Sequence, residues 1–163
     1  MSDLRIYSFP PIARPDAQVL VLGSMPGKAS LAAHQYYAHP RNLFWNIMGE
    51  LVGAGPDVPY AQRAQILQDQ HIALWDVLQS CTRESSLDSD IKCEVANDFP
   101  AFFLAHPQIT HVFFNGGKAE SMFRKHVKIY PEGLIFTRLP STSPAHASLS
   151  FEKKLVAWSQ VKV

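Results

Sequence analysis

The chain has 163 residues, of which 47% are hydrophobic and 18% are charged, and its 15 Lys and Arg against 14 Asp and Glu give a formal net charge of +1. This apolar content excludes a disordered chain, and at this length one core can bury enough surface without metal or disulfide staples. The near-zero charge neither favours nor excludes nucleic acid, because phosphate binding depends on where Lys and Arg cluster. We therefore expect one globular domain spanning residues 1–163.

The sequence shows no pattern typical of membrane or secreted proteins. Its apolar runs are far shorter than the ~20 residues that a membrane helix needs, and its N-terminal segment is polar and soon followed by Pro10, Pro11 and Pro15. Cys81 and Cys93 are too few for a disulfide framework or a zinc cluster, and the seven histidines lack metal-ligand spacing. We expect a cytoplasmic protein without a metal.

Short apolar runs, rich in β-branched or aromatic residues, alternate along the chain with helical patterns. Buried strands are predicted at 19–22, 71–75, 111–114 and 134–138. Helices are predicted at 43–52, 60–70, 98–105, 118–127 and 149–161. Because parallel strands need crossover connections, this alternation predicts an α/β domain, a three-layer sandwich with a central four-stranded parallel sheet.

The residues that follow each strand are the first candidates for chemistry, because ligands bind at the carboxyl ends of open parallel sheets. The first strand is followed by Gly23, Ser24, Met25, Pro26 and Gly27. Backbone N–H groups in this turn could hold an anion or a carbonyl, since glycine allows close approach. The turn lacks the Gly-Lys-Ser/Thr ending of a P-loop, so an ordinary strand-to-helix turn is an equally good interpretation.

Residues 35–45 concentrate aromatic, amide and basic side chains in the string Gln-Tyr-Tyr-Ala-His-Pro-Arg-Asn-Leu-Phe-Trp. Aromatic rings stack on nucleobases, amides match base edges, and His39 or Arg41 could meet phosphate. Alternatively, Asn42 caps the helix that follows it, and the two aromatic residues after Leu43 belong to the core.

Two polar residues directly follow buried strands. Asp76 comes after the second strand, where it could activate water or cap the next helix. Asn115 comes after the third strand and precedes Gly116 and Gly117. It could read a base edge or serve only the bend into the next helix.

Two later segments could contact phosphates. The loop at residues 141–144 is rigid and rich in hydroxyls that can donate to phosphate oxygens, although many surface turns have a similar composition. The stretch 118–128 is basic, with Glu120 as its one acidic residue. A solvated helix face has the same pattern.

Together, these segments resemble the uracil-DNA glycosylase superfamily, most closely its DNA-deoxyinosine (hypoxanthine-DNA) glycosylase branch. The strings that carry the resemblance are LGSMPG at 22–27, QYYAHPRNLFW at 35–45, LWDVL at 74–78, SLD at 86–88, NGGKA at 115–119 and LPSTSPA at 139–145. The resemblance implies a monofunctional glycosylase that removes hypoxanthine, and as further candidates uracil or xanthine, from DNA. It also implies that no cofactor is needed and that a monomer suffices.

The resemblance assigns roles by position. The base-binding pocket is expected to comprise Gly23, Ser24, Met25, Pro26, Tyr37 and Asn115, with the flipped base stacked on the Tyr37 ring. The DNA-binding surface is expected to comprise Lys118, Ser141, Thr142, Ser143 and Pro144. The 141–144 loop would enter the duplex and contact phosphate.

Met25 departs from the wider superfamily. The mismatch-specific uracil and thymine branch has a water-positioning Asn at this place, a role that a thioether cannot take. The deoxyinosine branch shares the loss and uses the Asn of its His-Pro-x-Asn string, which is Asn42 here, so the resemblance implies that Asn42 is catalytic. Met25 also motivates an alternative, a binding module that recognises damaged or single-stranded DNA without cutting it. A third class, a hydrolase of free nucleosides, fits the basic stretch 118–128 less well.

Overall fold

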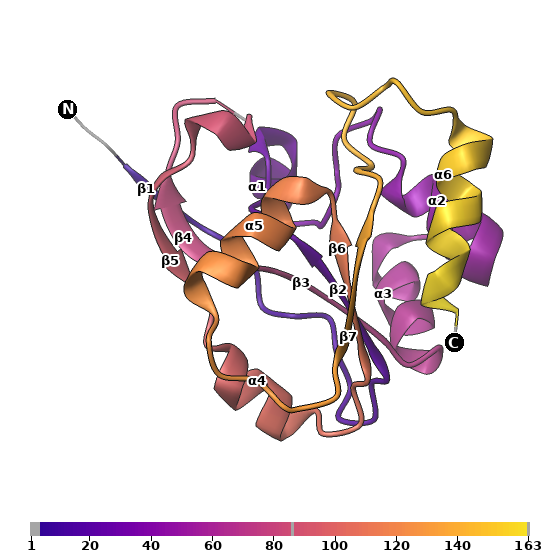
Figure 1. The fold of residues 1–163 in the computed structure, drawn as a ribbon. Helices are drawn as coiled ribbons and strands as arrows, with labels where there is room; N and C mark the ends of the chain where they lie inside the picture. The colour runs from indigo at the N-terminus through magenta and orange to yellow at the C-terminus, as the bar shows by residue number, and fades with distance from the viewer. Residues whose placement is uncertain (1–3, 86, 163) are drawn as a thin grey trace.

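The computed structural model describes residues 4–85 and 87–162, so Met1–Asp3, Val163 and Ser86 of the SLD string lie outside the described residues. Four parallel strands form the central sheet in the order β3-β2-β6-β7 (Figure 1). They are β2 (Val19–Gly23), β3 (Ile72–Asp76), β6 (His111–Asn115) and β7 (Ile135–Leu139). Each lies within one residue of its predicted range. The predicted four-stranded parallel sheet is therefore confirmed.

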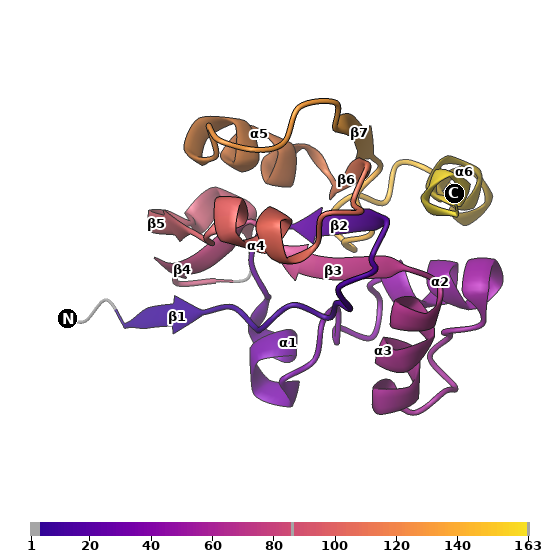
Figure 2. The same cartoon turned by 90° about the horizontal axis from the view of Figure 1, so that it is seen from below.

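Helices cover both faces of this sheet, and Figure 2 shows the two groups on opposite sides. One group comprises α2 (Phe44–Val52), α3 (Tyr60–Asp69) and α6 (Phe151–Trp158), and the other comprises α4 (Phe99–Ala105) and α5 (Gly117–His126). Because strand side chains alternate, Val19 and Val21 pack with the first group, whereas Leu20 and Leu22 pack with the second. This arrangement is the predicted three-layer sandwich.

A second sheet was not predicted, and the expectation of only four strands is wrong. It is antiparallel, with the order β1-β4-β5, and comprises β1 (Arg5–Tyr7), β4 (Leu78–Thr82) and β5 (Lys92–Ala96). These strands carry polar and charged residues in place of a continuous apolar run. Only some side chains, such as Leu78 and Cys81, reach the core beside α4 and α5.

The remaining described elements are short: α1 (Lys28–Ala33) and two 3-10 helices, η1 (Asp88–Asp90) and η2 (Ser159–Val161). Among the described residues, no helix is long and apolar enough to cross a membrane. The register pairs Gly23 of β2 with Asp76 of β3, and Asn115 of β6 with Leu139 of β7. The carboxyl ends of all four strands therefore meet at one edge of the sheet.

Candidate active site

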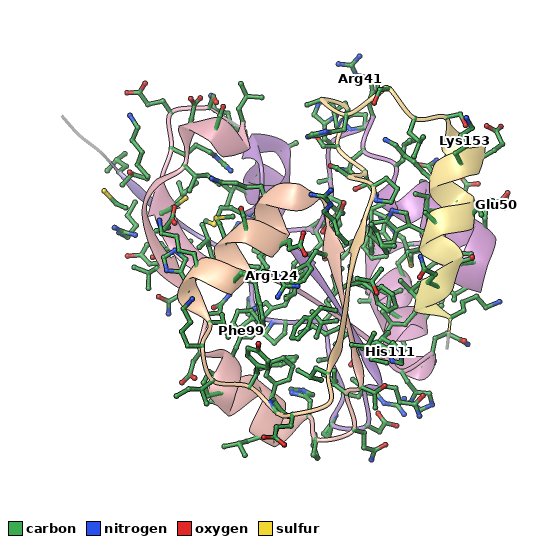
Figure 3. The ribbon with its side chains drawn as sticks, viewed as in Figure 1. Arg41, Glu50, Phe99, His111, Arg124 and Lys153 are labelled. Carbon is green, nitrogen blue, oxygen red and sulfur yellow. The ribbon has the colours of Figure 1, made fainter. Side chains whose placement is uncertain are left out.

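A pocket of about 440 Å³ lies at this edge. Its lining includes all the residues predicted to bind the base, Gly23, Ser24, Met25, Pro26, Tyr37 and Asn115, together with Asn42, Asp76, Ser141, Thr142, Ser143 and Pro144. Lys118 is exposed on α5 and does not line the pocket. Arg41 projects outward at this end of the molecule, whereas His111 begins β6 at the opposite edge (Figure 3).

Gly23 allows two side chains to converge over the end of β2. A Cβ at this position would lie 2.7 Å from Asp76 Oδ1 and 2.7 Å from Tyr37 Oη, so only glycine leaves both oxygens where they are. Asp76 is only 3% exposed. Its helix-capping interpretation is wrong, because Val77 leads β3 directly into β4 and no helix follows.

Tyr37 presents its ring to the pocket. Its backbone is in the left-handed region, with φ 55°, which is uncommon for a residue with a side chain. The ring stacks on Phe44, with centroids 4.4 Å apart. The neighbouring Tyr36 is instead buried, and its hydroxyl donates to the Pro10 carbonyl at 2.8 Å. Burial, followed by the charge of Asp76, raises the pKa of Tyr36.

Asn42 lies at the start of α2 and in the pocket, but the N-cap residue of α2 is Leu43, not Asn42 as the capping interpretation predicted. Asn42 Oδ1 accepts the N–H of Phe44, the first residue of α2, at 2.9 Å. It also lines the pocket and is half-buried. Because the bond identifies Oδ1 as the acceptor, the amide is oriented, and its NH₂ group occupies the other edge as a donor.

Asn115 is bound to the phosphate-contacting loop predicted at 141–144. Its Nδ2 donates to Thr142 Oγ1 at 2.9 Å, and its Oδ1 accepts the Thr142 N–H at 3.0 Å. The Thr142 carbonyl in turn accepts the Leu43 N–H at 3.0 Å. Thr142, which is 1% exposed, therefore joins the end of β6 to the segment that carries Asn42.

Helix α6 holds this loop at both ends, a function that the sequence analysis missed. Trp158 Nε1 donates to the Pro140 carbonyl at 2.9 Å, and Lys154 Nζ donates to the His146 carbonyl at 2.7 Å. Lys154 is 2% exposed, and its burial lowers its pKa. The sequence feature that could have revealed this role is the position of Lys154. It is at helical spacing from Phe151 and Trp158 and therefore lies on the apolar face of the helix.

The turn after β2 is fixed by residues outside the predicted site. Arg83, which follows β4, donates to the Pro26 carbonyl. Ser30 Oγ in α1 accepts the Ala38 N–H at 3.0 Å and so ties the two pocket segments together. Within residues 4–85 and 87–162, no group of three or more His, Cys, Asp or Glu side chains could hold a metal ion.

The chain matches known proteins over nearly its whole length. The model of the uracil DNA glycosylase superfamily matches residues 10–162, which include the whole pocket lining. The chain therefore belongs to the uracil DNA glycosylase superfamily. More specifically, a hypoxanthine DNA glycosylase of Methanosarcina barkeri is 38% identical over 117 residues, covering 71% of this chain and 74% of the relative. A hypoxanthine DNA glycosylase of Methanosarcina acetivorans is 37% identical over 112 residues, covering 68% and 71%.

A solved structure shares the fold. It is a Methanosarcina acetivorans protein studied by NMR in solution and described as a uracil DNA glycosylase; it is 31% identical, with a TM-score of 0.81 and 98% of both chains covered. The family and fold that the motifs predicted are confirmed. The roles of individual site residues stay predictions.

Proposed function

We propose that this protein is a DNA glycosylase that hydrolyses the N-glycosidic bond of hypoxanthine in DNA and leaves an abasic site, with uracil and xanthine as further candidate bases. The observation that carries this proposal is the convergence of Tyr37, Asn42 and the 141–144 loop on one pocket of about 440 Å³. This volume is within the usual range for small-ligand sites. The chain's relatives that bear the name hypoxanthine DNA glycosylase support the same base.

The chemistry matches these residue types. A base inside the duplex is out of reach, so the nucleotide is extruded and its base stacks on the Tyr37 ring. Water then adds to C1′ as the bond to the base nitrogen breaks, and the bonding electron pair leaves with the base. One proton of the water stays on the new 1′-hydroxyl and the other ends on the released base, which leaves as the neutral free base. Positive charge develops on the sugar and negative charge on the base. The Asn42 amide orients the water or donates to the departing base, because an amide is too weak a base to take the proton itself.

The DNA-binding surface surrounds the mouth of the pocket. Gly116 lies directly before α5 and beside the loop, since a Cβ there would be 3.1 Å from Ser141 Cβ. The start of α5 is thus close to the Ser141 hydroxyl. Lys118, which is exposed in the first turn of this helix, adds a positive charge, and these groups suit phosphate. All of these groups come from one chain, so we propose a monomer, acting in the cytoplasm where its DNA substrate is found.

The test uses duplexes that carry one deoxyinosine, one deoxyuridine or one deoxyxanthosine, followed by alkali to break the strand at abasic sites. We expect breaks mainly at deoxyinosine. Breaks mainly at deoxyuridine would keep the reaction and overturn the ranking of bases. No breaks, with lesion DNA still bound, would favour the alternative function, a binding module. The observation behind this alternative is Met25, which is buried and lines the pocket.

Asn42 is tested with two variants, because it also accepts the first N–H of α2. Asn42→Ala removes the amide and this acceptor, whereas Asn42→Asp keeps an acceptor for the Phe44 N–H but has no NH₂ group. Both should lose at least about 100-fold in single-turnover rate, the usual worth of a positioned polar group, while Asn42→Asp keeps the thermal stability. Asn46→Ala, an exposed residue of the same type on α2, is the matched control. Wild-type rates in Asn42→Ala would contradict the role, whereas wild-type rates in Asn42→Asp alone would exclude donation to the base and leave the orientation of water.

A further inference from the structure

The two glycines that follow β6 leave room for side chains from β7 and from the loop after it. A Cβ on Gly116 would lie 3.1 Å from Ser141 Cβ, and a Cβ on Gly117 would lie 3.0 Å from Arg138 Nη1. The Arg138 guanidinium therefore lies against the first residue of α5, beside the loop that begins at Ser141. The proposed DNA-binding surface gives this positive charge no task.

Arg138 has an acidic neighbour, Glu120, that holds it only weakly. Arg138 Nη1 lies 3.9 Å from Glu120 Oε1, and the two side chains are 62% and 27% exposed. Glu120 is shared with a second cation, because its Oε2 lies 3.3 Å from Arg124 Nη2. An exposed ion pair of this kind contributes little free energy. An anion that approaches Arg138 more closely can therefore replace Glu120.

A backbone phosphate of DNA is the anion that suits this place. Ser141 lines the pocket, and its Oγ accepts the Ser143 N–H at 3.1 Å, so the hydroxyl keeps its hydrogen for another acceptor. The planar guanidinium of Arg138 can donate to two phosphate oxygens at once. A nucleotide extruded into the pocket stays joined to the DNA backbone on both sides. Its neighbouring phosphates must therefore pass over the rim at which Ser141 lies.

We propose that Arg138 binds a backbone phosphate of the DNA substrate beside the pocket mouth, and that Glu120 holds the guanidinium in place until this phosphate replaces it. The inference rests on the proposed glycosylase function, because that function brings a DNA strand across the mouth. It also gives Gly117 a reason to be glycine, since a side chain there would push the Arg138 guanidinium away from the loop.

Arg124 provides the contrast to Arg138. It lies one helical turn after Glu120, and its guanidinium is 5.4 Å from the centre of the Phe136 ring. Figure 3 shows Arg124 on α5, well below the end of the molecule at which Arg41 projects. Its charge is therefore part of a solvated helix face and lies away from the pocket mouth.

The first test measures how the affinity for DNA depends on salt. The probe is a fluorescently labelled duplex that carries a non-cleavable deoxyinosine analogue. Each lost phosphate contact lowers the slope of log affinity against log salt concentration by about one. Arg138→Gln should bind more weakly and show this smaller slope. Arg124→Gln, which removes the same charge and also ends a pair with Glu120, should keep the wild-type slope. No change of slope in Arg138→Gln, or an equal change in both variants, would overturn the contact.

The second test concerns the replacement of Glu120 by phosphate. Glu120→Gln should raise the affinity for the same duplex by up to about fivefold, the worth of an exposed ion pair, because Arg138 then has no competing partner. The gain should be largely lost when Glu120→Gln is combined with Arg138→Gln. Simple repulsion between Glu120 and DNA predicts the same gain with and without Arg138. That result would overturn the replacement.

These measurements separate the inference from the proposed function, because binding and cleavage are measured independently. A wild-type protein with the expected dependence on Arg138 that never cuts deoxyinosine DNA would support the phosphate contact and overturn the proposed function. Cleavage of deoxyinosine DNA together with an unchanged salt dependence in Arg138→Gln would overturn only the phosphate contact.

Discussion

Gly23 is the residue whose missing side chain shapes the pocket. Asp76 and Tyr37 converge on the point where a Cβ of residue 23 would lie. Any side chain at this position must therefore displace one of them. The sequence presented Gly23 only as part of a turn. The position requires glycine because Asp76 and Tyr37 approach its backbone closely. Its backbone conformation does not require glycine, since its φ is outside the left-handed region.

Gly23→Ala should therefore lower base capture and stability together. Overpacking against Asp76 and Tyr37 should cost about 1–3 kcal/mol in the free energy of unfolding, and cleavage of deoxyinosine DNA should fall. Gly55→Ala is the control, since its Cβ would meet only Gly49 Cα, at 3.4 Å. Urea unfolding and single-turnover kinetics measure both effects, and unchanged values in Gly23→Ala would contradict the predicted collision.

Tyr37 separates stacking from hydrogen bonding. Tyr37→Ala removes the ring and should weaken capture of the flipped base by about 1–3 kcal/mol, the usual worth of a base-aromatic stack. Tyr37→Phe keeps the ring on Phe44 and should retain most of that affinity. Binding is measured with a duplex that carries a non-cleavable deoxyinosine analogue. Equal affinity of Tyr37→Ala and wild type would rule out the stacking role.

Among the secondary-structure elements, three hold the 141–144 loop in place. The end of β6 holds it through Asn115, the start of α2 through the Leu43 N–H, and α6 through Trp158 and Lys154. If this loop enters DNA as proposed, its rigidity favours binding, because less conformational entropy is lost. Burying the charged side chain of Lys154 costs free energy. Its hydrogen bond to the His146 carbonyl compensates for part of this cost and fixes the end of the loop.

Asn115→Ala should release the loop from β6. The variant leaves the buried N–H and hydroxyl of Thr142 without their partner, which should cost about 1–3 kcal/mol in the free energy of unfolding. Asn115→Asp keeps the acceptor for the Thr142 N–H and should lose less. Thermal unfolding and affinity for an abasic duplex test both variants. A loss of base discrimination without a loss of stability would instead support direct base reading by Asn115.

At the scale of the whole molecule, an acidic residue joins the small sheet to a helix on the large one. Glu94 in β5 lies 3.0 Å from Lys125 Nζ and 2.7 Å from His126 Nε2, both in α5. The bond to His126, and then the bond to Lys125, lower the pKa of Glu94 below its ordinary value of 4.5. A carboxyl group whose pKa is lower in the folded state than in the unfolded state stabilises the fold at any pH above its unfolded-state pKa. This stabilisation is lost progressively as the pH falls from that value through the lower pKa of the folded state.

Glu94→Gln should accordingly lower the free energy of unfolding at pH 7, by no more than about 1 kcal/mol because the ion pairs are partly exposed. The difference from wild type should shrink as the pH falls through 4.5 and below. Urea unfolding between pH 7 and pH 3 measures it, with the exposed Glu132→Gln as control. A difference that grows toward low pH would contradict the assigned direction.

The amino-acid sequence alone predicts the central sheet, its covering helices and the edge at which the pocket lies. Apolar periodicity is a local property, and parallel strands must place their carboxyl ends together, so Gly23, Asp76, Asn115 and the 141–144 loop were predicted to be neighbours. The order and spacing of the same strings also predicted the family.

The hydrogen-bond partners of these residues, and the elements that hold them, could be seen only in the folded chain. The β1-β4-β5 sheet escaped prediction because its strands are partly polar and only a few of their side chains, such as Leu78 and Cys81, reach the core beside α4 and α5. Asn115 and Thr142 are 27 residues apart, and Tyr37 and Asp76 can both approach the end of β2 only because the residue beside Asp76 is a glycine. A side chain's identity states what it can bind but not which distant partner the fold brings within reach, so such contacts depend on the packed chain as a whole.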